Sequence, residues 1–87
     1  MMKLNEYDLP LSERLLVSLH NLCATSGGMA KKSVELAQIL QTGIDEVNQN
    51  LDKHVSSGYV AAFYDHEGNR RFYLTSTGII RVCSLFS

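Results

Sequence analysis

The sequence has no apolar run that approaches the ~18 to 20 residues needed to cross a membrane as a helix. Its start, from Met1 to Asp8, also lacks the apolar stretch of a secretory signal peptide. These two absences exclude a membrane-spanning helix and an N-terminal secretion signal of the usual kind. They predict a cytoplasmic location.

Cysteine is scarce. Cys23 and Cys83 are the only two, and they lie far apart in the sequence, each among apolar residues. We expect them to be small buried hydrophobic side chains in a reducing compartment. A redox-sensing pair is the alternative, and a thiol titration of the folded protein would test it.

No set of residues with catalytic or metal-binding spacing can be assembled. There is no Ser/His/Asp set, no glycine-rich phosphate loop and no pair of carboxylates in apolar surroundings. His20 and Cys23 are three residues apart, but no Cys-x-x-Cys or His-x3-His completes a metal site. His54 is expected to be a partly packed histidine. We therefore expect neither catalysis nor a bound metal or cofactor.

Positive charge is not in surplus, because 8 Lys and Arg residues stand against 9 Asp and Glu residues and give a net charge of −1. A domain that holds nucleic acid by its phosphates usually has an excess of Lys and Arg. Any basic surface on this protein must therefore be local.

What the chain does have is an ordinary globular composition. It contains 87 residues, of which 45% are apolar and 20% are charged. A chain of this length has room for one hydrophobic core, and this composition excludes wholesale disorder. We predict a single domain over 1–87, without linker or internal repeat.

Three helices are predicted in the first 58 residues. The first begins at Pro10 or Ser12 and ends at Cys23 or Ala24, where a Gly-containing loop follows. The second covers 33–40, with Ser33 as its N-cap, and the third has Asp45 as its N-cap and ends at Gly58. Apolar residues at three- and four-residue spacing give their expected buried sides: Leu11, Leu15, Leu19 and Leu22; Leu36, Ala37 and Leu40; Val47, Leu51 and Val55.

A β-hairpin and a last helix complete the chain. Strands are expected over 59–64 and 70–74, joined by a loop in which Gly68 and Asn69 tolerate positive φ. Thr75 or Ser76 caps the last helix, which is apolar nearly all round and therefore needs burial on two sides. The residues expected to share one side of it are Ile79, Val82, Cys83 and Phe86.

Two short helices joined by a tight turn and followed by a hairpin are typical of a winged helix-turn-helix. The predicted fold class is therefore α+β: a three-helix core with a two-stranded β-hairpin wing and a C-terminal fourth helix. The helix-turn-helix is expected over 33–57, the wing over 59–74 and the last helix over 76–86.

Three segments resemble the small winged-helix regulators of the MarR, PadR and HxlR type. Glu35-Leu36-Ala37-Gln38-Ile39-Leu40 is similar to their "ELA" segment. Val47-x3-Leu51 with Gly58-Tyr59-Val60 is similar to their recognition helix and the glycine before the wing. Tyr73-Leu74-Thr75-Ser76-Thr77-Gly78 resembles the run that ends the wing. The resemblance, which covers about residues 12–86, implies a homodimeric repressor or activator whose third helix enters the major groove of double-stranded DNA while the wing touches the adjacent backbone.

The helix over 44–57 would supply the base contacts, for which we single out Asn48, Gln49 and Lys53. Amide side chains have the paired donor and acceptor that read adenine in the major groove. Members of these families usually carry Arg, Lys, Ser or Thr on this face, whereas this helix carries the acids Asp45, Glu46 and Asp52. A solvated polar face without DNA contact is therefore the alternative.

Phosphate contacts are expected from Lys31 and Lys32 before the second helix and from Arg70 and Arg71 after the wing tip. Salt bridges across the hairpin are the alternative role of the two arginines. Acids outnumber bases by one over 29–73, so we expect weak and strongly salt-sensitive DNA binding unless a dimer doubles the contacts.

The homodimer is expected to form through the first and last helices. Two functions remain open: a homodimeric DNA-binding transcriptional regulator, and a winged helix used as a protein-protein interaction module with little or no DNA binding. The acidic third helix favours the second. The predicted dimer contacts are Leu16, Val17, His20, Ile80 and Leu85.

Overall fold

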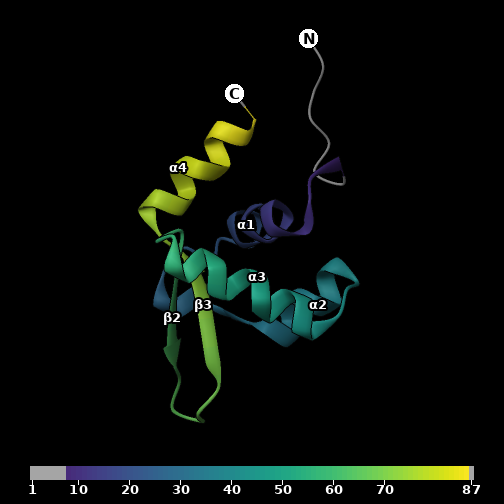
Figure 1. Ribbon diagram of the computed structural model, residues 1–87. Coiled ribbons are helices and arrows are strands. Elements are labelled where there is room, and N and C mark those ends of the chain that lie inside the picture. The colour runs from purple at the N-terminus through teal and green to yellow at the C-terminus, as the bar shows by residue number, and fades with distance from the viewer. Residues whose placement is uncertain (1–7, 87) are drawn as a thin grey trace.

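The computed structural model describes residues 8–86 and confirms the predicted winged helix-turn-helix (Figure 1). Four α-helices surround a small antiparallel sheet with strand order β1-β3-β2. The elements, in chain order, are α1 (Leu11–Asn21), the 3-10 turn η2 (Gly27–Met29), β1 (Lys31–Lys32), α2 (Ser33–Leu40), α3 (Ile44–Ser56), β2 (Val60–Tyr64), β3 (Arg70–Leu74) and α4 (Ser76–Leu85).

The first helix ends earlier than predicted. Pro10 precedes its first turn as expected, but the helix stops at Asn21 because Cys23 takes up a left-handed conformation with φ 57°. Ala24 then folds back, its N–H donating to the Leu19 carbonyl at 2.8 Å and its carbonyl accepting from the Leu74 N–H at 2.7 Å. The end of α1 is thereby tied to the sheet.

The predicted caps of α2 and α3 are wrong by one and two positions. Lys32, not Ser33, is the residue before α2, and its N–H donates to Glu35 Oε1 at 2.9 Å. Gly43, not Asp45, precedes α3, so Asp45 lies in the first turn of the helix. The left-handed residue of the turn is Gln41, with φ 53°, whereas Gly43 is extended. In the α2–α3 turn the glycine therefore does not mark the place where the backbone turns left-handed.

The third strand of the sheet was not predicted. β1 is only two residues long and pairs antiparallel with β3, Lys31 opposite Phe72 and Lys32 opposite Arg71. A strand this short carries no alternating pattern that could be recognised. It fixes the start of α2 against the wing, whose strands β2 and β3 pair from Val60–Leu74 to Tyr64–Arg70.

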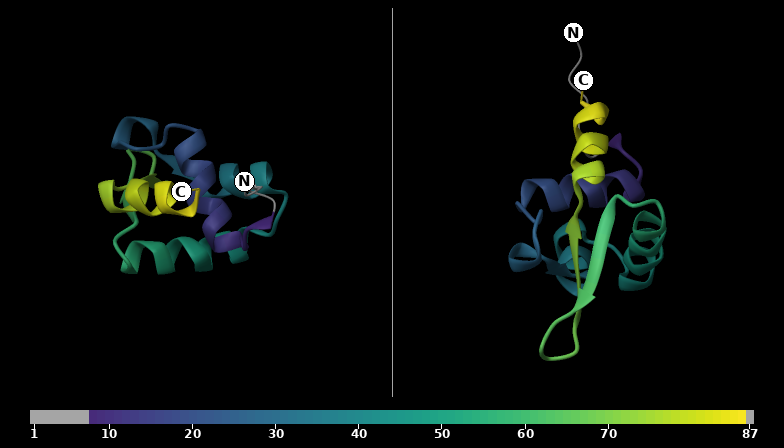
Figure 2. Two further views of the ribbon diagram at one scale, coloured as in Figure 1. Left: turned by 90° about the horizontal axis from the view of Figure 1, so that it is seen from above. Right: turned by 90° about the vertical axis from the view of Figure 1, so that its left-hand side faces the viewer.

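The core lies between α1, α2, α3 and the base of the sheet. Its largest fully buried side chains are Phe72, Leu15, Leu16, Leu19, Leu36, Leu51, Leu74 and Val47. Leu16 and Val17 are 1% and 3% exposed, so the prediction that they form a dimer contact was wrong. The reason is that α1 crosses the middle of the domain and is covered by neighbours on more than one side, α4 among them (Figure 2).

Helix α4 begins in a tight junction. The Thr75 hydroxyl accepts from the Gly78 N–H at 3.0 Å and donates to the Gly58 carbonyl at 2.6 Å, which joins the end of α3 to the start of α4. A Cβ on Gly78 would lie 2.1 Å from the Tyr59 carbonyl oxygen and 2.7 Å from Leu74 Cδ1. The Thr75 and Gly78 pattern that carries the family resemblance therefore has a local structural reason.

The buried side of α4 differs from the predicted one. Val82 is buried and Ile79 and Leu85 pack partly against the core, whereas Cys83 and Phe86 are exposed. Ile80 is 69% exposed. The helix extends away from the other elements, at the opposite end of the molecule from the hairpin tip (Figures 1 and 2). It therefore has less of the core to cover than its apolar sequence suggests.

Both cysteines are exposed, which contradicts the prediction that they are buried hydrophobic side chains. Cys23 lies beyond the end of α1 on the left-handed turn, and Cys83 lies on the side of α4 that no other element covers. Their apolar neighbours in sequence wrongly suggested burial. Cys23 comes after the buried side of α1 has ended, and Cys83 lies beside the buried side of α4.

Candidate nucleic-acid interface

Helix α3 and the hairpin lie side by side and are joined by an ion pair. The helix lies beside the base of the hairpin, and the tip of the hairpin projects beyond all the helices (Figures 1 and 2). Val47, Leu51 and His54 hold α3 to the core, so the opposite side of the helix is free to contact a partner. Among residues 8–86, no group of three or more His, Cys, Asp or Glu side chains is placed to hold a metal ion, and no helix could span a bilayer.

The outward side of α3 carries two of the three predicted base-reading residues. Gln49 and Lys53 are exposed and four residues apart, so they lie one turn from each other on the same side of the helix. Asn48 is half-buried and less accessible. Asn50 donates through Nδ2 to the Glu46 carbonyl at 2.8 Å. Gln49 and Lys53 are therefore the side chains on α3 best placed to reach a ligand.

The acids of the first turn of α3 serve the helix itself. Asp45 and Glu46 lie where free N–H groups and the helix dipole favour negative charge. Glu46 also accepts from the Thr42 hydroxyl at 3.2 Å, which ties the α2–α3 turn to the helix. Their presence is explained without a partner.

Asp52 belongs to an ion pair that the sequence did not reveal. Its Oδ1 lies 2.8 Å from Nη1 of Arg70, which also stacks over the Phe72 ring, 4.9 Å from the centroid. The pair joins α3 to the wing. Residues 18 positions apart in different elements show no sequence signal for such a contact.

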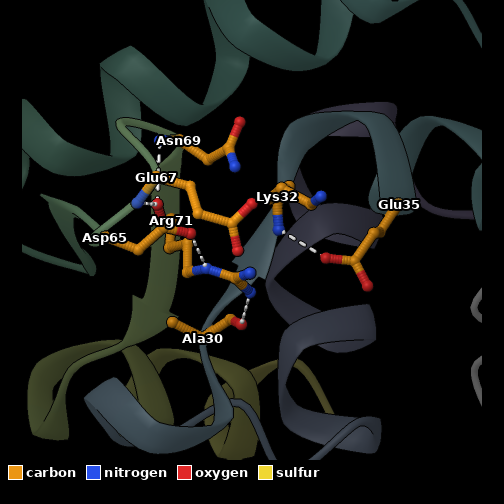
Figure 3. A network of polar contacts seen from close by, with 7 residues as sticks. All are labelled: Ala30, Lys32, Glu35, Asp65, Glu67, Asn69 and Arg71. Atoms are coloured by element: carbon orange, nitrogen blue, oxygen red, sulfur yellow. Dashed lines mark hydrogen bonds and ion pairs between the residues drawn. The ribbon is translucent and has the colours of Figure 1, made fainter.

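Asp65 organises the wing tip (Figure 3). Its Oδ1 accepts from the N–H groups of Glu67 and Asn69, each at 2.9 Å, and its Oδ2 lies 2.6 Å from Arg71 Nε. The hydrogen bond from Arg71 and those from the two N–H groups lower the pKa of Asp65 from 3.8 to about 2. Gly68, with φ 81°, supplies the left-handed residue of the turn, as predicted.

Arg71 extends this network to Ala30, the residue before β1. Its Nη1 donates to the Ala30 carbonyl at 3.3 Å, next to the segment where Lys32 and Glu35 begin α2 (Figure 3). The alternative prediction, that the wing arginines form salt bridges across the hairpin, therefore holds for Arg71, which pairs with Asp65 of the same hairpin. Arg70 also forms a salt bridge, but to α3 rather than across the hairpin.

The remaining predicted phosphate contacts are the lysines before α2. Lys31 and Lys32 are half-buried in β1. Lys53 on α3 is exposed, and within residues 8–86 none of the three has an ion-pair partner. They are the cations of this surface that are not already committed to a carboxylate.

His54 fixes α3 to the start of α1. It is buried, and Nε2 donates to the Ser12 carbonyl at 2.6 Å. Burial lowers the pKa of His54 below 6.5, although the Ser12 contact opposes the shift. As predicted, it is a packed histidine, and the neutral ring is the form that this site favours.

Tyr64 is a further side chain of this surface that the sequence did not single out. It is 71% exposed and lies opposite Arg70 in the hairpin, so the two side chains project from the same face of the sheet. Its position past the end of the core explains why an aromatic residue is exposed here.

No protein-family model and no curated protein matches the sequence. Solved structures do match. TubR from Bacillus megaterium pBM400 is similar over 92% of this chain and 89% of that chain, with TM-score 0.76 and 18% identity. The fold is a winged helix. The DNA-binding TubR fragment from Clostridium botulinum is similar over 98% and 100% of the two chains, with TM-score 0.75 and 20% identity.

A mutant MarR from E. coli, solved with operator DNA, has the same arrangement. The TM-score is 0.71 at 22% identity over 90% of this chain, which spans 54% of the MarR chain. The predicted resemblance to MarR-type regulators is thus confirmed for the fold. At 18 to 22% identity this similarity shows the fold alone.

Proposed function

We propose that the protein is a DNA-binding transcriptional regulator that acts as a homodimer and reads the major groove with α3. The observation that carries the proposal is the exposed pair Gln49 and Lys53 on the outward side of α3, beside a hairpin that projects past the helices. An α-helix fits the major groove, and a projecting hairpin can reach the adjacent backbone. The proteins of similar fold include a DNA-binding TubR fragment and a MarR solved with operator DNA.

The acids near α3 and the wing are less unfavourable for DNA binding than the sequence suggests, because two of them are paired with arginines. Asp52 and Asp65 are neutralised by Arg70 and Arg71, and Asp45 and Glu46 lie at the positive end of the helix dipole. Lys31, Lys32 and Lys53 then provide the positive charge for phosphates. With so few free cations, binding by one protomer should be weak and should depend steeply on salt.

The proposed homodimer uses α4. This helix extends at the end of the molecule opposite the wing tip, and it exposes the apolar side chains Ile80 and Phe86. Pairing of two such helices about a two-fold axis would bury both patches and leave both copies of α3 accessible. His20 is exposed and Leu85 is half-buried, so both remain candidates for the contact, whereas Leu16 and Val17 do not.

A DNA-binding titration at two salt concentrations tests the proposal, using genomic fragments that include the region upstream of the protein's own gene. Binding that prefers one fragment and weakens steeply with salt is expected. Gln49→Ala should cost about 1 to 3 kcal/mol of preference for that fragment, and Lys53→Ala should weaken binding to all fragments alike. Thr77→Ala, at an exposed position of α4 outside both α3 and the wing, is the control and should leave binding unchanged.

The dimer is tested separately by sedimentation. A monomer at tens of micromolar would contradict it, because an obligate pair should be associated far below that concentration. Ile80→Glu should produce such a monomer without unfolding it, since the side chain is exposed within one protomer.

A protein-protein interaction module is the second candidate. It is favoured by the exposed acids Asp45 and Glu46 at the start of α3, which would repel phosphates that approached this end of the helix. No DNA binding at low salt would support it. The variants that separate the two functions are those of Lys31, Lys32 and Lys53, because removal of Arg71 would also disturb the wing tip.

A further inference from the structure

The two adjacent arginines of the wing have different partners. Arg71 is held by both Asp65 and the Ala30 carbonyl, and its side chain is 30% exposed. Arg70 has a single charged contact, one Nη1 to one Oδ1 of Asp52, with side-chain exposures of 38% and 58%. A guanidinium has five N–H donors, so most of the binding capacity of Arg70 is not used by Asp52.

We propose that Asp52 stands in for a DNA phosphate: it holds Arg70 in the free protein, and a backbone phosphate displaces it when DNA binds. Asp52 then acts as a built-in competitor that limits DNA affinity. The inference rests on the proposed DNA-binding function and names the residue that tunes it.

The exchange is favoured by the geometry of the pair. Exposed ion pairs are worth little in water, so the loss of the Asp52 contact costs little, whereas Arg and phosphate can form two parallel hydrogen bonds. The Phe72 ring centroid lies 4.9 Å from Arg70 Cζ, and this cation–π contact does not depend on which anion the guanidinium binds. The exchange therefore needs no rearrangement of the hairpin.

The site lies where a phosphate would pass. Arg70 is on the wing, which we propose reaches the neighbouring backbone, and it contacts Asp52 of α3, which we propose enters the major groove. Tyr64, opposite Arg70 in the hairpin, adds a hydroxyl donor on the same face. The hairpin thus carries two donors on the face where Arg70 contacts the Asp52 carboxylate.

A double-mutant cycle of Asp52→Asn and Arg70→Ala, titrated with the preferred DNA fragment at several salt concentrations, tests the inference. Asp52→Asn should tighten binding about threefold at low salt, because a phosphate then reaches Arg70 without displacing a carboxylate, and should steepen the salt dependence by about one unit. Arg70→Ala should weaken wild-type binding by less than about threefold but the Asp52→Asn protein by about tenfold.

Asp45→Asn is the matched control. It removes the same charge from the same helix, and within residues 8–86 Asp45 has no ion-pair partner. It should raise affinity less than Asp52→Asn and leave the salt dependence unchanged, because no arginine is released. Thermal unfolding of all four proteins of the cycle shows whether the wing is still folded.

Three results overturn the inference. Equal effects of Asp52→Asn and Asp45→Asn would mean that only total charge matters. Weaker binding of Asp52→Asn would mean that Asp52 positions Arg70 for DNA instead of competing with it. No binding by any of the proteins at low salt would remove the proposed function as well, and this outcome is distinct because the wild type then fails too.

Discussion

The core and the wing of this domain are held together by different kinds of contact. Between α1, α2, α3 and the base of the sheet the packing is apolar, and His54 is the one buried polar side chain among residues 8–86. Beyond Phe63 the hairpin is fixed by charged groups, Asp65 with Arg71 and Asp52 with Arg70. Apolar burial depends little on pH or salt, whereas these ion pairs depend on both. The two regions should therefore respond to different perturbations.

The largest effect is expected from a cavity in the core. Leu51 is fully buried, and Leu51→Ala should lower the free energy of unfolding by about 2 to 5 kcal/mol, through lost burial and the space left behind. Urea denaturation followed by circular dichroism measures it. Ile39→Ala, at an exposed position of α2, is the control and should change stability by less than about 0.5 kcal/mol. Similar losses for both variants would contradict the assigned core.

Overpacking at the start of α4 should have the next largest effect. In Gly78→Ala the new Cβ would meet the Tyr59 carbonyl and Leu74, so we expect a loss of about 1 to 3 kcal/mol in the same urea experiment. Gly28→Ala introduces a Cβ with no atom within 4 Å and should be nearly neutral. A stable Gly78→Ala protein would mean that the α3–α4 junction can widen.

The difference between the apolar core and the charged wing also explains which features could be predicted from the sequence. Apolar spacing placed Leu15, Leu36 and Leu51 in the core, because burial repeats with the helix period. Thr75 was correctly predicted as a cap of α4. Burial was predicted less accurately at the edge of the core. Cys23 and Cys83 lie next to the buried sides of their helices but are exposed. Leu16, predicted to be at the surface, is covered by elements that are distant in sequence.

The candidate site was predictable only as a list of side chains. Gln49 and Lys53 could be found because helix periodicity opposes them to Val47 and Leu51. Which carboxylate pairs with which arginine depends on how α3 and the hairpin pack, and no local pattern records that. The ion pair between Asp52 and Arg70 therefore became visible only in the three-dimensional structure.

His54 lies on α3 but belongs to the core, and it should make the core itself sensitive to pH. Its pKa is lowered in the folded state by burial, so the unfolded protein binds the proton more readily. Stability from this group is present above the unfolded pKa of 6.5 and should fall as the pH drops from there through the folded pKa. Urea denaturation between pH 8 and pH 5.5 measures the decline. His54→Gln, which has no titrating ring, should show a flatter profile.

The smallest effect on global stability, and the most local one, is expected at the wing tip. The pKa of Asp65 is lowered from 3.8 to about 2 by Arg71 and by the Glu67 and Asn69 N–H groups, so its contribution is present above 3.8 and is lost as the pH falls toward 2. Amide NMR signals of Glu67 and Asn69 should shift in this interval, ahead of signals from core residues such as Leu19. Asp65→Asn retains an acceptor oxygen without the charge, so it should abolish the titration while the hairpin still forms. If wing and core signals instead change together, the charged network at the wing tip is not a separate unit, and the two regions unfold as one.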